Sequence, residues 1–445
     1  MSGGIFESAT AIARAIRDRE LSVVEVVEAH RRRIEAVNPA INAVCLLTAD
    51  AALDAARRAD AAIARGELLG PLHGVPMTLK DNLNVAGVVT TGGTQGRRNF
   101  VPREDSSVMR RLRDAGAILL GRTTTPELTM AYETANLLHG RVNHPLDANL
   151  TPGGSSGGAA AILAAGGAAF DIGSDTGGSI RVPSHFCGTA GLKATDGRIS
   201  KAGHIVPPGA PADLTTQLGP MARTVEDLVL LLPVLSESEV PDPGKVSIGG
   251  LRVGFFTSGG LAAPTSEIGE VVNAACRALA SAGACVEPVL LPGVEETFDL
   301  TLAMWTADGG EAFREVLAAS GTTEISPFME IVLGVCERGK ATDVEAVLAR
   351  WRAFRRRMGE AARAFDVLVS PVCPFPALRH GRSFDDDCFP GFAHTMLHNL
   401  TGWPALSVPV AKTAAGLPIG VQVAAAPWRE DLVLAAGACV EGCAL

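Results

Sequence analysis

Two short segments rich in glycine and serine constrain this chain more than any other part of its sequence. They are Pro152–Gly158 and Gly173–Arg181. An apolar run leads into the second segment, and an alanine-rich stretch that begins at Ala159 follows the first. Glycine lets the backbone turn sharply and approach a neighbour closely. A helix that begins at Ala159 would aim its free N–H groups at the preceding loop. The pattern therefore predicts tight loops between buried strands and helices.

The remaining pattern predicts an α/β protein. Short apolar runs predict strands at 75–79, 117–120, 168–173, 252–256 and 367–370, and three helices are expected within 8–66 and a fourth at 105–115. The helix after Ser22 carries a capping box with Glu25 and should end near Ala36. Helices between short buried strands favour a central twisted mixed sheet that is covered by helices on both faces.

The chain of 445 residues is long enough for two or three domains, but we expect one. Sequence motifs continue past the Pro-rich connection at 236–250, and no internal repeat is present. The expected single domain, 1–445, has a helical segment at 8–66, a core at 70–232 and a C-terminal portion at 250–445. Residues 202–220, rich in Pro and Gly, are expected to form a long ordered loop.

Charge and cysteine usage exclude several classes of protein. Asp and Glu outnumber Lys and Arg by 48 to 39, and no basic run suggests nucleic-acid binding. The nine cysteines have irregular spacing, which favours a reducing cytosol over a disulfide framework. Arg14 and Arg17 interrupt any signal-peptide core, and the uncharged stretch 150–170 is too rich in Gly and Ser to span a membrane. We expect a cytoplasmic protein.

Two serines and one lysine offer acyl-transfer chemistry. Lys80 ends an apolar run, and burial would lower its pKa and make it a general base. Ser155 and Ser179 lie in the two Gly/Ser segments, where free backbone N–H groups can stabilise an oxyanion. The alternatives are a flexible or phosphate-binding loop at 152–158, a cap role for Ser179 and an ion pair between Lys80 and Asp81. The Gly-x-x-x-x-Gly-Lys-Ser/Thr phosphate motif is absent.

Histidines suggest a metal site only weakly. His394 and His398 are four residues apart, but no Glu follows His394 and no third ligand is evident. A Gly-x-Ser-x-Gly nucleophile elbow is also absent, which argues against an α/β-hydrolase. We expect neither a metal nor a cofactor.

The three segments, in this order, resemble the amidase signature family of serine hydrolases. The family pattern has a Gly-[Val/Ile]-Pro-x-x-x-Lys-Asp strand end, a Gly-Gly-Ser-Ser-Gly-Gly loop and a Gly-x-Asp-x-Gly-Gly-Ser-Ile-Arg-x-Pro segment, and this chain has all three. The separation of the two serines also matches. Further matches are Pro71–Gly74, Phe186–Gly188, Gly191–Lys193, Gly219–Arg223 and Leu417–Gln422. The resemblance runs from about residue 8 to about residue 440.

The resemblance implies the amidase signature fold and a role for each site residue. Ser179 would be the nucleophile, Lys80 the base, and Ser155, after a cis peptide bond, the bridge between them. The N–H groups of Thr176, Gly177, Gly178 and Ser179 would form the oxyanion hole. Ser156, Asp175 and Arg181 would support the two loops, and Thr129, Met130, Gly153 and Gly154 would contact the substrate. Water would then hydrolyse the acyl-enzyme.

The family includes amidases, fatty-acid amide hydrolases, aryl acylamidases, carbamate hydrolases and the glutaminase subunit of tRNA-dependent amidotransferases. That subunit has a tyrosine-rich segment where this chain reads Cys336–Asp343, so a free-standing hydrolase, monomeric or homodimeric, is the favoured prediction. The variable loops 129–138, 203–218, 298–335 and 389–400 are expected to shape the substrate pocket. They contain Met130, Met304, Trp305, Phe328, Leu333, Phe389, Phe392 and Met396.

Those side chains favour a neutral, apolar acyl or aryl amide, with ester and carbamate hydrolysis open. They fit equally a role in the core. A catalytically silent binding module on the same fold is disfavoured, because Lys80, Ser155 and Ser179 are all present.

Overall fold

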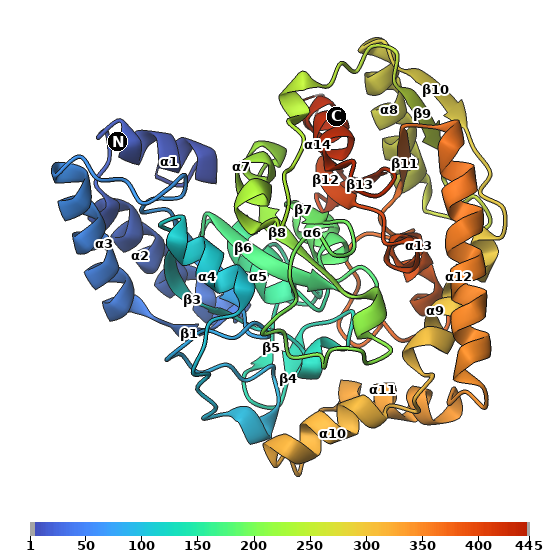
Figure 1. Cartoon of the computed structure of the whole chain (residues 1–445), viewed down its shortest axis with the longest axis horizontal. Coiled ribbons are helices and arrows are strands. Elements are labelled where there is room, and N and C mark those ends of the chain that lie inside the picture. Colours follow the sequence, from blue (N-terminus) through green and yellow to red (C-terminus); the bar gives the residue numbers. More distant parts are fainter. Residues whose placement is uncertain (1–4, 443–445) are drawn as a thin grey trace.

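The computed structural model describes residues 5–442, which fold around one large mixed β-sheet (Figure 1). Its strands are β1 Val44–Leu47, β2 Pro76–Lys80, β3 Ile118–Thr123, β6 Phe170–Asp175, β7 Ala190–Lys193, β8 Gln217–Ala222, β9 Arg252–Phe255, β10 Cys285–Pro288, β11 Val367–Pro371, β12 Ala405–Lys412 and β13 Pro418–Ala424. The spatial order of these eleven strands is β1-β3-β2-β6-β8-β7-β12-β13-β11-β9-β10. A separate hairpin joins β4 Ala135–Asn136 to β5 Gly140–Arg141.

The described residues form fourteen α-helices. They are α1 Ala9–Arg17, α2 Val23–Ile41, α3 Ala49–Ala64, α4 Ser107–Asp114, α5 Gly157–Ala164, α6 Arg181–Cys187, α7 Val225–Leu235, α8 Ser266–Ser281, α9 Thr297–Trp305, α10 Glu311–Ser320, α11 Pro327–Arg338, α12 Val344–Ala361, α13 Ala393–Thr401 and α14 Glu430–Glu441. Figure 1 shows α1–α3 at one end of the sheet and α8 at the other.

Parallel pairs lie on both sides of an antiparallel middle, and the edge strand β1 pairs antiparallel with β3. Strand β2 runs parallel to β3 and β6, and β9 runs parallel to β10 and β11, whereas β6, β8, β7, β12, β13 and β11 pair antiparallel in that order. Residues of β13 alternate between two covered faces. Val421 and Val423 belong to the apolar core that includes α14, while Gln422 between them bonds Arg181 of α6. The predicted single α/β domain with helices on both faces is confirmed.

The N-terminal helices follow the capping signals in the sequence, although one boundary was predicted too early. Ser22 Oγ accepts from Glu25 N at 3.2 Å and Glu25 Oε2 accepts from Ser22 N at 3.0 Å, which completes the predicted capping box of α2. The helix continues past Ala36 to Ile41. It ends at Asn42, which adopts the left-handed conformation (φ 53°) that closes many helices.

The expected long loop at 202–220 is partly wrong, because its end forms β8 in the middle of the sheet. Gly219 and Pro220 resemble turn residues in the sequence, yet both lie within this strand. A Cβ on Gly219 would lie 1.7 Å from the carbonyl oxygen of Leu192 on β7. Only glycine allows the neighbouring strand this close, so the residue that suggests a turn is needed for strand packing.

Candidate active site

The topology brings together the three segments that the sequence singled out. Strands β2 and β6 are parallel neighbours, so Lys80, the last residue of β2, and Asp175, the last residue of β6, lie at the same edge of the sheet. The loop before α5 carries Ser155 to this edge, and the turn after β6 carries Ser179.

Lys80 is fully buried and points at Ser155. Its Nζ donates to Ser155 Oγ at 2.7 Å, to Ser174 Oγ at 3.0 Å and to the Ser174 carbonyl oxygen at 3.4 Å. Burial lowers the pKa of Lys80 to about 7, although the charges of Asp175 and Asp171 oppose this shift. The alternative ion pair with Asp81 is wrong, because Asp81 faces Arg122 Nε at 3.4 Å and accepts hydrogen bonds from Thr91.

Ser155 stands between the lysine and the second loop. The peptide bond between Gly154 and Ser155 is cis, as the resemblance implied. A Cβ on Gly154 would lie 2.6 Å from the Ala131 carbonyl oxygen, so this close approach requires glycine. Ser156 N donates to the Ser179 carbonyl oxygen at 3.1 Å and ties the two loops together.

The turn that presents Ser179 is held by a buried ion pair. Asp175 accepts from Gly178 N at 2.7 Å and from Ile180 N at 3.0 Å. Arg181 donates to the same carboxylate through Nε at 3.0 Å and Nη2 at 2.8 Å. Burial alone would raise the pKa of Asp175. The charge and hydrogen bonds of the Arg181 guanidinium outweigh this effect and hold that pKa well below its usual range.

The backbone N–H groups of residues 176–179 divide into two kinds. Among residues 5–442, the structure gives no acceptor to the N–H groups of Thr176, Gly177 and Ser179. The N–H of Gly178 already donates to Asp175, so it does not join them. The Gly177 carbonyl oxygen accepts from Tyr132 Oη at 2.8 Å and from Thr395 Oγ1 at 2.6 Å, which fixes the Gly177–Gly178 peptide from its other side.

A cavity opens onto Ser179, which is 7% exposed. The cavity encloses about 580 Å³ of empty space, including part that is open to solvent. Its lining residues are Thr129, Met130, Ala131, Tyr132, Thr176, Gly177, Ser179, Leu302, Trp305, Thr306, Val332, Val335, Cys336, Phe384 and Phe389. None of these side chains is charged.

The structure brings only part of the predicted substrate pocket to the cavity. Thr129, Met130, Trp305 and Phe389 line it, whereas Met304, Phe392 and Met396 lie in the apolar core, and Phe328 and Leu333 of α11 are partly buried outside the lining set.

Gly153 and Gly154 do not line the cavity either. Gly153 lies against Pro183, and Gly154 against Ala131 and Glu133. Sequence reasoning placed Tyr132, the only tyrosine in the chain, within the predicted pocket loop 129–138 without singling it out, and it missed Phe384 in an Asp-rich loop. Their shared signal, an isolated aromatic ring in a polar stretch, is weak.

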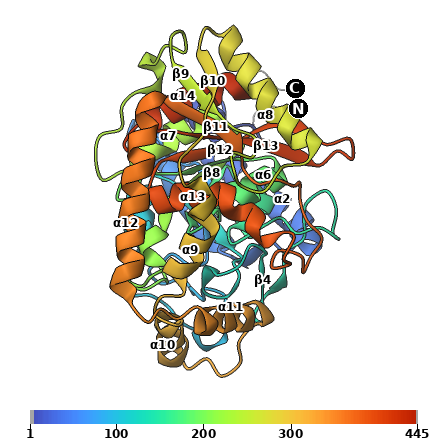
Figure 2. The same ribbon diagram turned by 90° about the vertical axis from the view of Figure 1, so that its right-hand side faces the viewer.

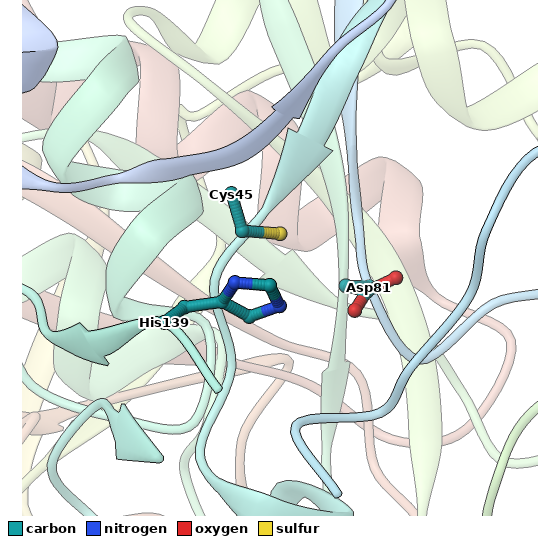
Figure 3. Close-up of side chains that lie close together, drawn as sticks. All are labelled: Cys45, Asp81 and His139. Atoms are coloured by element: carbon teal, nitrogen blue, oxygen red, sulfur yellow. The ribbon is translucent and has the colours of Figure 1, made fainter. Parts of the chain in front are cut away.

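Among the described residues, one side-chain cluster has the composition of a metal site. Ligand atoms of Cys45, Asp81 and His139 lie within 4.8 Å of one another (Figure 3). However, Arg122 pairs with Asp81, and Cys45 Sγ donates to the Arg122 carbonyl oxygen at 3.4 Å. A cation would have to displace this buried guanidinium from its carboxylate, so the residues do not favour one.

His394 and His398 do not form a metal site with a third ligand in the described chain. His394 Nε2 bonds the Ala262 carbonyl oxygen at 2.9 Å instead.

Comparison with known proteins identifies the family. The family model described as Amidase matches residues 25–434. The chain belongs to the amidase family. A curated relative from Carboxydothermus hydrogenoformans, which is a glutamyl-tRNA(Gln) amidotransferase subunit, is 33% identical over 96% of this chain and 95% of its own length. This amidase acts on carbon–nitrogen bonds other than peptide bonds.

Solved structures share the whole fold. The 6-aminohexanoate cyclic dimer hydrolase superimposes with a TM-score of 0.88 and 27% identity, covering 99% of this chain and 97% of its own. A bacterial aryl acylamidase of the amidase signature family has a TM-score of 0.87 and 26% identity, again over 99% and 97%. Among residues 5–442, no helix of this amidase combines the length and apolar character that crossing a membrane requires.

Proposed function

We propose that this amidase hydrolyses neutral amides with an apolar acyl or aryl group, through an acyl-enzyme on Ser179. Ser179 Oγ attacks the carbonyl carbon, and its proton passes through the Ser155 hydroxyl to the neutral amine of Lys80. Lys80 then gives that proton, through the Ser155 hydroxyl, to the leaving amine as the C–N bond breaks. Water then attacks the acyl-enzyme by the same relay and releases the acid. The same chemistry extends to esters and carbamates.

The observation that carries this proposal is the buried contact between Lys80 Nζ and Ser155 Oγ at 2.7 Å. A lysine with a pKa near 7 accepts a proton readily at neutral pH. The N–H groups of Thr176, Gly177 and Ser179 are the donors available for the oxyanion. The proposed oxyanion hole therefore has three of the four backbone N–H groups that the family resemblance implied. No hydrogen bond joins the Ser155 and Ser179 hydroxyls within the described chain, and this link is expected to close when substrate binds.

The cavity wall supports the substrate class. Its side chains include Met130, Leu302, Trp305, Val332 and Phe389, and no charged group faces the space above Ser179. A charged substrate group would lose its hydration there without gaining a partner, which is costly. An apolar group loses little and gains from burial.

A second candidate is the glutaminase subunit of a tRNA-dependent amidotransferase, with partner subunits. The curated relative's identity over almost its whole length favours it. Free glutamine carries an α-ammonium and an α-carboxylate, and the cavity offers neither charge a counterion. For this reason we place the hydrolase first.

The two candidates differ in what the purified chain does alone. We expect higher kcat/KM for a neutral anilide, ester or carbamate than for glutamine. Glutamine as the best substrate, with other subunits copurifying, would establish the second candidate instead. A chain that turns over none of these compounds and does not react with a fluorophosphonate at Ser179 would be a silent binding module.

A further inference from the structure

A buried glutamate stands at each end of the segment that forms one side of the cavity. Thr129, Met130, Ala131 and Tyr132 line the cavity, and the segment is bounded by Glu127 and Glu133. Both glutamates are 3% exposed, and neither lines the cavity. Buried carboxylates need donors, and the donors here come from segments far away in the sequence.

Glu133 holds the loop that supplies two aromatic rings of the wall. Its Oε2 accepts from Gly381 N at 2.8 Å and its Oε1 accepts from Ser383 N at 3.0 Å. Phe384 follows directly, and its ring lies 5.2 Å from that of Phe389. Both rings line the cavity. The carboxylate therefore fixes the backbone from which this aromatic wall projects.

Glu127 makes the corresponding contact with α11. Its Oε2 accepts from Ser326 N at 2.7 Å, at the residue that caps this helix, and its Oε1 accepts from Thr94 Oγ1 at 2.7 Å. Thr94 in turn shares a hydrogen bond of 2.8 Å with Thr322. Helix α11 supplies Val332, Val335 and Cys336 to the cavity.

The two walls differ in their other connections to the catalytic loops. The loop that carries Phe384 also bonds the segment before Ser155, because Thr151 N donates to the Leu378 carbonyl oxygen at 2.9 Å. Figures 1 and 2 show α10 and α11 at the lower edge of the molecule, outside the layers that cover the sheet. The two walls meet each other where the Phe328 ring of α11 lies 5.9 Å from that of Phe384. The segment between the glutamates is itself unusual, because Leu128 and Thr129 both have positive φ (49° and 66°).

We propose that Glu127 and Glu133 are positioning residues that hold both outer walls of the cavity against the catalytic centre and so set its selectivity for apolar substrate groups. This inference rests on the proposed function. It assigns the glutamates no contact with substrate or with a reacting atom. Their effect is on where Val332, Val335, Cys336, Phe384 and Phe389 stand relative to Ser179.

Because the two glutamates accept from different kinds of donor, we expect different effects from Glu133→Gln and Glu127→Gln. Glu133 accepts from two backbone N–H groups, one on each oxygen. In Glu133→Gln the NH₂ group, which is a donor, would face one of these N–H donors, and neither would have an acceptor. Glu127 accepts from one N–H and one hydroxyl. A hydroxyl can accept as well as donate, so Glu127→Gln can give its NH₂ to Thr94 and keep the bond from Ser326. Glu127→Ala loses both.

The experiment compares two fluorophosphonates, one with a methyl group and one with a long alkyl chain, as covalent probes of Ser179. Labelling rates are measured on the whole chain, and the adduct is located by peptide mapping. The wild type should react faster with the long-chain probe. Glu133→Gln and Glu127→Ala should lower the ratio of long-chain to methyl rates about tenfold, the effect of an unpaired buried polar group. Glu127→Gln should keep the ratio within about twofold.

Glu330→Gln, an exposed change on α11, is the matched control and should leave the ratio unchanged. The methyl rate should stay near the wild-type value in every variant, because the relay is untouched. If Glu133→Gln does not fold, the Glu127→Ala and Glu127→Gln pair makes the same comparison.

Several results would overturn the inference. A wild type without long-chain preference, a Glu133→Gln chain that keeps the preference, or equal losses in the two glutamine variants would each do so. A wild type that labels at another serine, or at none, would instead refute the proposed function on which the inference rests.

Discussion

In the proposed relay, the protonation state of Lys80 decides whether Ser179 can lose its proton. Since burial lowers the pKa of Lys80 to about 7, the amine is neutral above this pH and charged below it. We expect kcat/KM for a neutral amide to fall below about pH 7, with an optimum on the alkaline side. Lys80→Met should lower kcat by about 10²- to 10⁴-fold and remove this acid limb. Near-normal amide turnover in that variant would place the base elsewhere.

The same residue links stability to pH. An ion-paired lysine stabilises the fold less as the pH rises, whereas Lys80, with its lowered pKa, destabilises the fold less as the pH rises. Between pH 7 and the ordinary lysine value of 10.5, the unfolded chain binds a proton at Lys80 that the folded chain does not. The contribution of Lys80 to the free energy of unfolding therefore increases as the pH rises across this window. Denaturant unfolding of Lys80→Met beside wild type should show a smaller rise with pH. Parallel curves would contradict the lowered pKa.

Tyr132 bonds a carbonyl group of the loop that carries the proposed oxyanion hole. Its hydroxyl donates to the Gly177 carbonyl oxygen, and Thr395 donates to the same atom. Tyr132→Phe removes one of two donors, so kcat should fall about 2- to 10-fold with little change in KM. Thr395→Val in the same chain should then cost more than it does alone. Steady-state kinetics of the two single variants and the double variant measure this coupling.

At the scale of elements, the turn between β6 and α6 depends on one ion pair. Asp175 and Arg181 are fully buried, and Arg181 also donates to the Thr395 carbonyl oxygen at 2.9 Å and to Gln422 Oε1 at 2.8 Å. Asp175→Asn leaves the guanidinium without its counterion and should lower the free energy of unfolding by about 3–5 kcal/mol. Urea denaturation measures this loss. A change below about 1 kcal/mol would show that the pair is not needed to hold the turn.

For the whole molecule, the proposed chemistry uses only side chains and backbone N–H groups. Exhaustive chelation should therefore leave kcat/KM unchanged. Cys45→Ser and His139→Asn, which alter the cluster in Figure 3, should behave like wild type in the same assay. Loss of activity on chelation with recovery on adding Zn²⁺ would contradict the serine–serine–lysine relay, and loss in these two variants would locate the metal.

The sequence alone determined the α/β class, the family resemblance and the three segments that meet at the site. Glycines beside the serines and a lysine at the end of an apolar run are local signals, because turns and buried strands depend on nearby residues. Strand β8 was not predictable in this way, since Gly219 fits a turn as well as it fits a crowded strand. Only the approach of Leu192 from β7 distinguishes the two.

Tertiary structure alone decided how the site is completed. It moved Met304, Phe392 and Met396 into the core, and brought Tyr132 and Phe384 to the cavity. It also joined Glu127 to Ser326 and Glu133 to Ser383, pairs about 200 and 250 residues apart. The physical reason is that a hydrogen bond or an apolar contact depends on distance in space. Residue types fix which groups need a partner, and only the packed chain fixes which partner they find.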